Sequence, residues 1–213
     1  MNNVLTRFRL FASCAVVFAF LAAGVCLAPQ DAAAQQSGGV IKGAVKSPWV
    51  SRYEALVYVD QVPGTFPSLK EKPFVSQKGL VFLPHVLGVV RGTTVDFTND
   101  DSVAHNVSSP PGSATVFNLG LYGAGVTKTV TFDNLGEVPL LCSVHPEMAA
   151  FVIVLQNPHF AVTDKAGNFE IKNVPPGNYQ LKVWNEKLQP ASLSVAVEAG
   201  KTVTVEFKDL KKR

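Results

Sequence analysis

Cysteine and methionine are scarce in this chain, which has three cysteines and two methionines among its 213 residues. Small disulfide-stapled scaffolds are far richer in cysteine, so that class is excluded. Charge is also sparse, because charged residues make up 16% of the chain and the formal net charge is +3. So weak a positive bias gives no reason to expect a nucleic acid or an anionic membrane as a partner.

One long apolar run is present, at residues 10–27, and it follows Arg7 and Arg9 near the start of the chain. The run gives way to the small residues of the sequence AAAQ at 32–35, a pattern typical of signal-peptide cleavage. We therefore predict that residues 1–34 are a cleaved signal peptide and that the mature protein is periplasmic.

Two other interpretations of this segment stay open. A membrane anchor is one, although the run is only about as long as a short transmembrane span and has no positively charged stop-transfer flank. A lipid anchor at Cys26 is the other, although Val25 stands where lipoprotein signals usually place Gly, Ala or Ser. After cleavage of the signal, we expect no stable membrane insertion.

Removal of the signal peptide leaves one cysteine, Cys142, and one methionine, Met148. Loss of Arg7, Arg9 and Asp31 also lowers the formal net charge from +3 to +2. No disulfide can form within such a mature chain. A single thiol in an oxidising compartment calls for an explanation such as metal ligation.

Segments with strand character recur along most of the mature chain, and no segment shows a sustained helical period. The predicted strands are residues 39–45, 55–62, 79–82, 93–99, 128–132, 138–144, 150–156, 168–171, 178–183, 191–197 and 202–207. Turn signals such as PPG at 110–112 and PPGN at 175–178 separate them. We predict an all-β protein with the strand spacing of β-sandwiches.

The residues that carry chemistry are concentrated in the segment LLCSVHPEM at 140–148. Its spacing C-x2-H-x2-M places the Cys142 thiolate, the His145 imidazole and the Met148 thioether on one short loop after a strand. A remote histidine would complete the site, and His105, after a strand and an Asp/Asn-rich turn, is the candidate. Two imidazoles, one thiolate and a weak axial thioether form a type 1 copper site, and soft sulfur ligands select copper. We predict that these four residues hold one copper ion.

Less specific roles for the same residues stay open. A buried free cysteine is often an inert hydrophobe, and methionine commonly fills gaps in a core. His105 is also placed to cap the neighbouring turn. Zinc with a water ligand would suit the three strong ligands. Glu147 would compete as a ligand if Met148 were turned away.

Two further histidines, His85 and His159, lie outside this pattern. We predict that His159 is structural and that His85 lies at a strand entrance, with a second metal contact or a gate for electron exchange as its alternative role. No Ser/His/Asp order, glycine-rich phosphate loop or paired-carboxylate spacing is evident. We therefore predict that the protein is not an enzyme.

The ligand pattern resembles that of the cupredoxins, specifically the pseudoazurin and amicyanin type with the short ligand loop. The resemblance covers residues 70–156 and includes LVFLPHVLGVVRGTTVDFTNDDSVAHNV at 80–107. It implies a Greek-key β-sandwich, electron transfer, and a redox partner such as a cytochrome or a periplasmic oxidoreductase. It also implies that Asn106 helps to tie the two ligand loops together. The copper ligands that it implies are His105, Cys142, His145 and Met148.

A second resemblance covers the rest of the mature chain. Residues 159–207 resemble the carboxypeptidase regulatory-like domain, a small transthyretin-like β-sandwich, in the segments TDKAGNF and VPPGNY. Residues 39–62, GVIKGAVKSPWVSRYEALVYVDQV, resemble the first two strands of that domain. We therefore predict a discontinuous regulatory-like domain, residues 39–62 and 157–208, with the cupredoxin domain inserted into it. Its predicted role is to orient the copper domain.

Three functions compete at this point. Electron transfer is the first, copper binding and handling without redox cycling is the second, and the third is a structural or binding β-sandwich with a zinc or vestigial metal site. An oxidase or nitrite reductase would need a further catalytic copper centre. Only two histidines remain to build such a centre.

Overall fold

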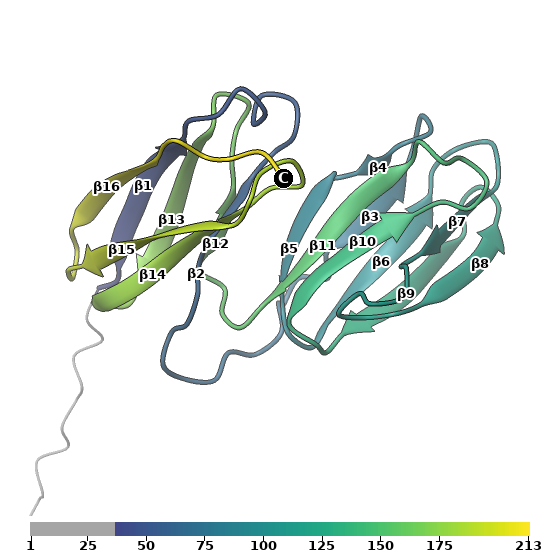
Figure 1. The fold of residues 1–213 in the computed structure, drawn as a ribbon. Helices are drawn as coiled ribbons and strands as arrows, with labels where there is room; N and C mark the ends of the chain where they lie inside the picture. The colour runs from purple at the N-terminus through teal and green to yellow at the C-terminus, as the bar shows by residue number, and fades with distance from the viewer. Residues whose placement is uncertain (1–36) are drawn as a thin grey trace, which may run out of the picture. The chain divides into compact units, whose positions relative to one another are not determined.

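The computed structural model describes residues 37–213, which form strands joined by turns and loops (Figure 1). The predicted signal peptide, residues 1–34, lies outside the described residues. No helix occurs among residues 37–213, and this range accordingly holds no helix able to cross a membrane. The predicted all-β sandwich class is confirmed.

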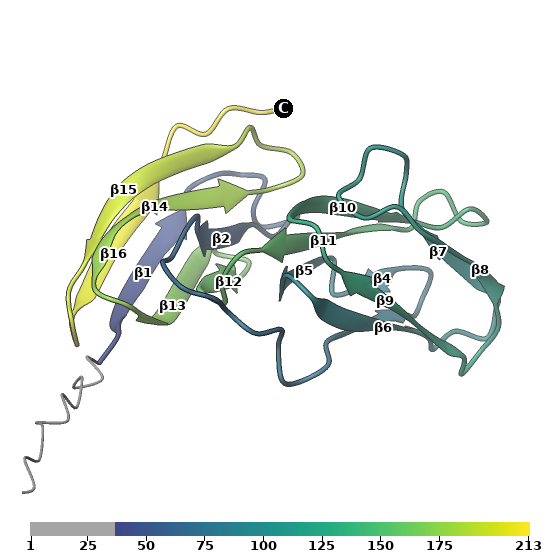
Figure 2. The ribbon, with the colours of Figure 1, turned by 90° about the horizontal axis from the view of Figure 1, so that it is seen from below.

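One pair of sheets is built from both ends of the described chain (Figures 1 and 2). Its first sheet has the order β13-β1-β16, with β1 Gly39–Val45, β13 Asn168–Val174 and β16 Thr202–Phe207. Its second sheet has the order β12-β2-β14-β15, with β2 Leu56–Val59, β12 Phe160–Val162, β14 Gly177–Trp184 and β15 Ala191–Val197. Strand β1 pairs antiparallel with β13 and parallel with β16.

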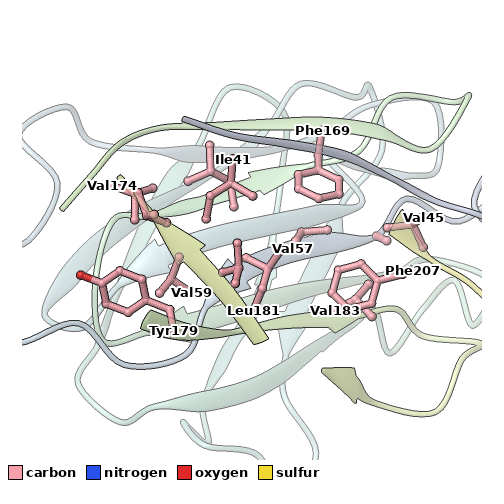
Figure 3. Close-up of a cluster of buried hydrophobic side chains, with 14 of the residues drawn as sticks. Ile41, Val45, Val57, Val59, Phe169, Val174, Tyr179, Leu181, Val183 and Phe207 are labelled. Atoms are coloured by element: carbon pink, nitrogen blue, oxygen red, sulfur yellow. The ribbon is translucent and has the colours of Figure 1, made fainter. Parts of the chain in front are cut away.

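Alternating apolar residues of these two sheets form one core (Figure 3). Ile41 and Phe169 come from the first sheet, and Val57, Leu181 and Tyr179 come from the second. Each fully buried aliphatic or aromatic side chain stabilises the fold by about 1.5–3 kcal/mol relative to an exposed one. The apolar side chains that alternate along these strands therefore form the interface that packs the two sheets face to face.

The second pair of sheets is built from the middle of the chain. One sheet has the order β5-β11-β10-β7-β8, with β5 Val86–Val90, β7 His105–Ser108, β8 Asn118–Tyr122, β10 Gly136–Leu141 and β11 Ala149–Leu155. The other has the order β4-β3-β6-β9, with β3 Phe74–Gln77, β4 Phe82–Leu83, β6 Thr93–Asn99 and β9 Thr127–Phe132. A separate core lies between them, formed by residues such as Val95, Phe97, Phe132, Leu140 and Val152.

Strand β11 is buried on both of its faces. Ala150, Val152 and Val154 point into the core of the second pair of sheets. Ile153 and Leu155 belong instead to a third cluster, which also contains Leu56, Val86 and Trp184. Because this cluster draws on both pairs of sheets, apolar packing joins them within one compact unit of the chain.

The strand predictions fail at particular places. Residues 79–81 are a turn with positive φ at Gly79 and Leu80, so little of the predicted strand at 79–82 is present. Strand β10 ends at Leu141, three residues before the predicted end, because the ligand loop begins there. Strands β3, β5 and β8 lie outside the predicted strand ranges, because β3 and β8 are short and β5 is too evenly buried to show alternation. Two further segments with expected strand character, the residues after His105 and residues 160–164, contain β7 and β12.

Candidate metal centre

Three strands bring the predicted ligands to one end of the second pair of sheets. His105 is the first residue of β7, and Cys142 follows directly after β10. These two strands are neighbours in the same sheet, paired at Ser108 and Leu141. The segment after Cys142 then turns sharply, with the Met148 amide donating a hydrogen bond to the His145 carbonyl at 3.0 Å, and leads into β11. Ligands that are far apart in the sequence therefore meet because β7 and β10 are paired.

His105, Cys142 and His145 offer ligand atoms that all lie within 4.8 Å of one another. The Nδ1 atoms of His105 and His145 are 3.0 Å apart, and Cys142 Sγ is 3.8 Å from His145 Nδ1. An ion about 2.0 Å from each imidazole nitrogen and about 2.3 Å from a thiolate holds such ligand atoms about 3–4 Å apart. The observed separations therefore fit a single ion bound by all three side chains.

The centre is largely closed to solvent. The side chains of His105, Cys142 and Met148 are 0%, 5% and 1% exposed, whereas His145 is half-buried. Met148 and Cys142 belong to the same buried cluster, so the thioether lies in the apolar surroundings of the thiol. Glu147 is exposed and is not part of the group of candidate ligands. The His145 ring is thus the ligand nearest to solvent.

Asp101 holds His105 from the side opposite the other ligands. Its Oδ2 atom lies 2.8 Å from His105 Nε2. The same carboxylate accepts hydrogen bonds from the backbone amides of Gly79 at 2.7 Å and Leu80 at 3.1 Å. These backbone bonds first, and the His105 bond after them, lower the pKa of Asp101 to about 2. The group is therefore ionised at neutral pH.

A buried polar network lies beside the centre. Gln77 Nε2 donates a hydrogen bond to the Tyr122 hydroxyl at 2.6 Å, and that hydroxyl donates to the Phe97 carbonyl at 3.3 Å. Burial raises the pKa of Tyr122 to about 12, with a smaller contribution from nearby Cys142 that acts in the same direction. Asn99 ties the turn before His105 to this network by donating to the carbonyls of Val103 and Tyr122. The side chains of Gln77, Tyr122 and Asn99 beside the centre are therefore uncharged at neutral pH, and hydrogen bonds join these three residues.

The other residues named from the sequence take different places. Asn106 donates to Asn118 of β8 at 2.8 Å, and no hydrogen bond joins its side chain to the ligand loop in the described chain. The tie between the ligand segments is instead the pairing of Ser108 with Leu141. His85 Nε2 lies 3.0 Å from Oε1 of Glu186, a residue of the segment that follows β14. His159 is buried, and its ring packs against the ring of Phe66.

Sequence reasoning missed the contact between Asp101 and His105. The position of Asp101 four residues before His105 was visible, but it was read only as part of a polar turn. The sequence does hold one signal for this contact. A histidine that binds a metal through one ring nitrogen usually donates a hydrogen bond from the other, so an acceptor near His105 is expected. Which of the neighbouring Asn and Asp side chains supplies that acceptor is settled by the turn geometry.

The fold and the cluster define an all-β protein with a candidate mononuclear metal centre of two imidazoles and one thiolate. A family model described as the carboxypeptidase regulatory-like domain matches residues 146–209. The match confirms the predicted resemblance to that domain, and it begins within the ligand loop and therefore includes β11. No curated protein matches the chain.

Solved structures similar to parts of this chain include cupredoxins, the other family that the sequence resembles. A purple cupredoxin from Nitrosopumilus maritimus is 29% identical, with 39% of this chain and 99% of that one covered and a TM-score of 0.35. A point mutant of amicyanin in its oxidized state is 23% identical, with 40% and 84% covered and a TM-score of 0.38. A copper-containing nitrite reductase from Thermus scotoductus SA-01 is 23% identical, with 53% of this chain but only 28% of the enzyme covered and a TM-score of 0.38.

Proposed function

We propose that this protein is an exported, periplasmic carrier of single electrons that binds one type 1 copper ion. The observation that carries the proposal is the convergence of His105, Cys142 and His145 within 4.8 Å in a largely buried site. Met148, buried in the same cluster as Cys142, would supply the weak axial thioether. Export rests on the signal-like features of residues 1–34.

The donor set favours copper over zinc. Structural zinc sites use four strong ligands, whereas this site offers three, and the Met148 thioether is buried in the same apolar cluster as Cys142. Thiolate and thioether are soft ligands that suit copper, and a bound copper ion would supply a reversible one-electron couple. Glu147, the alternative hard ligand, is exposed.

The protein side chains are arranged to keep the site rigid and dry. His105 is held by Asp101, and the ligand loop runs straight into β11, which is packed on both faces. A rigid donor set changes little between oxidation states, and that property lowers the reorganisation needed for electron transfer. The half-buried His145 ring would be the point of electron entry and exit. Exposed Val144, which precedes His145, and exposed Leu141, which precedes Cys142, would contact a redox partner such as a cytochrome.

The two pairs of sheets would be two domains, a cupredoxin domain at residues 70–156 and a regulatory-like domain at residues 39–62 and 157–208. The separate cores support this division. We assign no catalytic role to the regulatory-like domain. It would orient the copper domain, because it packs on β11 through the cluster around Trp184.

The test is the optical and electron paramagnetic resonance spectrum of residues 35–213 loaded with Cu(II). We expect an intense thiolate-to-copper charge-transfer band, a narrow copper hyperfine splitting, and a reversible one-electron couple by voltammetry. Cys142→Ala is the control that should lose the band while keeping the fold, because Ala fits any buried site that Cys occupies.

Other outcomes would support different functions. Stoichiometric zinc without copper colour would contradict the proposal and favour a structural metal site. A blue protein that loses copper readily to a chelator and shows no reversible couple would favour copper handling. Reduction of nitrite or oxygen by the copper-loaded protein would contradict the assignment as a non-enzymatic carrier.

A further inference from the structure

The contact between Asp101 and His105 determines the tautomer of that histidine. An ionised carboxylate accepts hydrogen bonds and has none to donate. The atom that lies 2.8 Å from Asp101 Oδ2, His105 Nε2, must therefore carry a proton. It follows that Nδ1 of the neutral ring has the free lone pair, and Nδ1 is the atom that faces His145 at 3.0 Å.

Asp101 is itself firmly positioned. It accepts from the amides of Gly79 and Leu80, at a turn where both residues have positive φ. Its own amide donates to Asn99 Oδ1 at 3.0 Å, and Asn99 is fully buried. Three elements of the second pair of sheets therefore hold Asp101. The turn before β4 and the first residue of β7 contact its carboxylate, and the end of β6 contacts its backbone amide.

We propose that Asp101 is the positioning residue of the metal centre, orienting His105 with Nδ1 toward the ion and stabilising the oxidised state. This inference rests on the proposed copper function and goes beyond it. A carboxylate that accepts from a ligating imidazole makes the ring a stronger electron donor. Its negative charge also favours the ion of higher charge in a site of low dielectric constant. Both effects stabilise Cu(II) more than Cu(I).

The neighbouring Asp100 provides a matched control. It carries the same charge one residue away, but its side chain accepts a hydrogen bond from Ser76, and the hydrogen bonds of the His105 ring go to Asp101 and His145 instead. Asp100→Asn therefore changes the overall charge by the same amount as Asp101→Asn. The difference between the two variants isolates the contact with the histidine.

The first experiment compares the reduction potential and the affinities for Cu(II) and Cu(I) in the wild type, D101N and D100N. We expect D101N to retain the charge-transfer band, because Cys142 and His145 remain. It should bind Cu(II) about 10-fold or more weakly, bind Cu(I) with a smaller loss, and show a higher potential. D101E should recover part of the potential. Equal shifts in D101N and D100N would overturn the proposal.

The second experiment uses the metal-free protein and separates this proposal from the proposed function. Nitrogen-15 NMR of the histidine rings at pH 8 should show His105 as the Nε2–H tautomer, with Nδ1 unprotonated. A protonated Nδ1 would overturn the role of Asp101 whether or not the protein binds copper. Failure of the wild type to take up copper would overturn the proposed function. The NMR measurement of the His105 tautomer would still test the contact with Asp101, because it uses the metal-free protein.

Discussion

Trp184 donates a hydrogen bond from its indole nitrogen to Glu137 Oε2 at 2.8 Å, and this bond joins β14 to β10 across the two pairs of sheets. The centroid of the Trp184 ring also lies 4.9 Å from the centroid of the Phe151 ring on β11. Strands β10 and β11 flank the ligand loop. One side chain of the regulatory-like segment thus contacts both strands that support the candidate metal centre.

Trp184→Ala should lower the free energy of unfolding by about 3 kcal/mol or more, since truncation of a buried tryptophan leaves a large cavity. Trp184 is 7% exposed, and its loss would also leave Glu137 without the indole donor. Urea unfolding followed by far-ultraviolet circular dichroism measures this value. Trp49→Ala is the control, with a smaller expected loss, because Trp49 is only partly buried. Equal losses would show that the Trp184 contacts contribute little.

Gly88→Ala should destabilise the protein by about 1–3 kcal/mol through overpacking. A Cβ atom at this position of β5 would lie 2.6 Å from the Phe160 ring and 2.8 Å from Leu56, which both belong to the other pair of sheets. Gly123→Ala is the control, because a Cβ there would have no atom within 4 Å. We expect that variant to stay within about 0.5 kcal/mol of the wild type. Thermal unfolding of both variants tests the difference, and a neutral G88A would mean that the packing at β5 is loose.

Met148→Leu should leave the fold intact and raise the reduction potential of the copper-loaded protein. Leucine has nearly the same volume as methionine, so the expected cost in stability is below about 1.5 kcal/mol. Removal of an axial thioether takes away a donor that favours Cu(II), and the axial ligand tunes the potential of such sites. Voltammetry of the wild type and M148L measures the shift. An unchanged potential would show that Met148 serves only to fill the core.

The free energy of unfolding should fall as the pH is lowered through about 6.5, in part because of His159. Burial lowers the pKa of His159 below its ordinary value of 6.5 in the folded protein. Between that lowered value and 6.5, the unfolded chain binds more protons than the folded chain does, so acid favours unfolding. The contribution is fully present above pH 6.5 and is lost as the pH falls.

His159→Gln is the variant that tests this dependence. Urea unfolding of the wild type and H159Q at pH 8 and at pH 5.5 should show a smaller loss of stability in the variant. The difference between the two proteins isolates His159 from the other histidines. A parallel decline in both would mean that the imidazole of His159 is free to become protonated in the folded state.

Much of the fold was predictable from local pattern. Strands β6, β15 and β16 alternate more buried with less buried residues, and the predicted bounds of these strands and of β1 agree with the structure. Other strands were missed because their residues lack this alternation: β3 and β8 are short, and β5 is buried along most of its length. The turn at Gly79 and Leu80 was predicted to be strand. The Asp101 carboxylate, which is remote in sequence, stabilises this turn, and local pattern does not reveal that contact.

The sequence by itself determined the all-β class and the candidate metal ligands of the loop at 140–148, because alternation and ligand spacing are properties of neighbouring residues. The tertiary structure alone decided which groups surround them. It brings His105 next to Cys142 and His145 through the pairing of β7 with β10, and it aims Asp101 at His105 Nε2. It also packs β11 on both faces. These relationships join residues distant along the chain, and only the packing of the sheets specifies them.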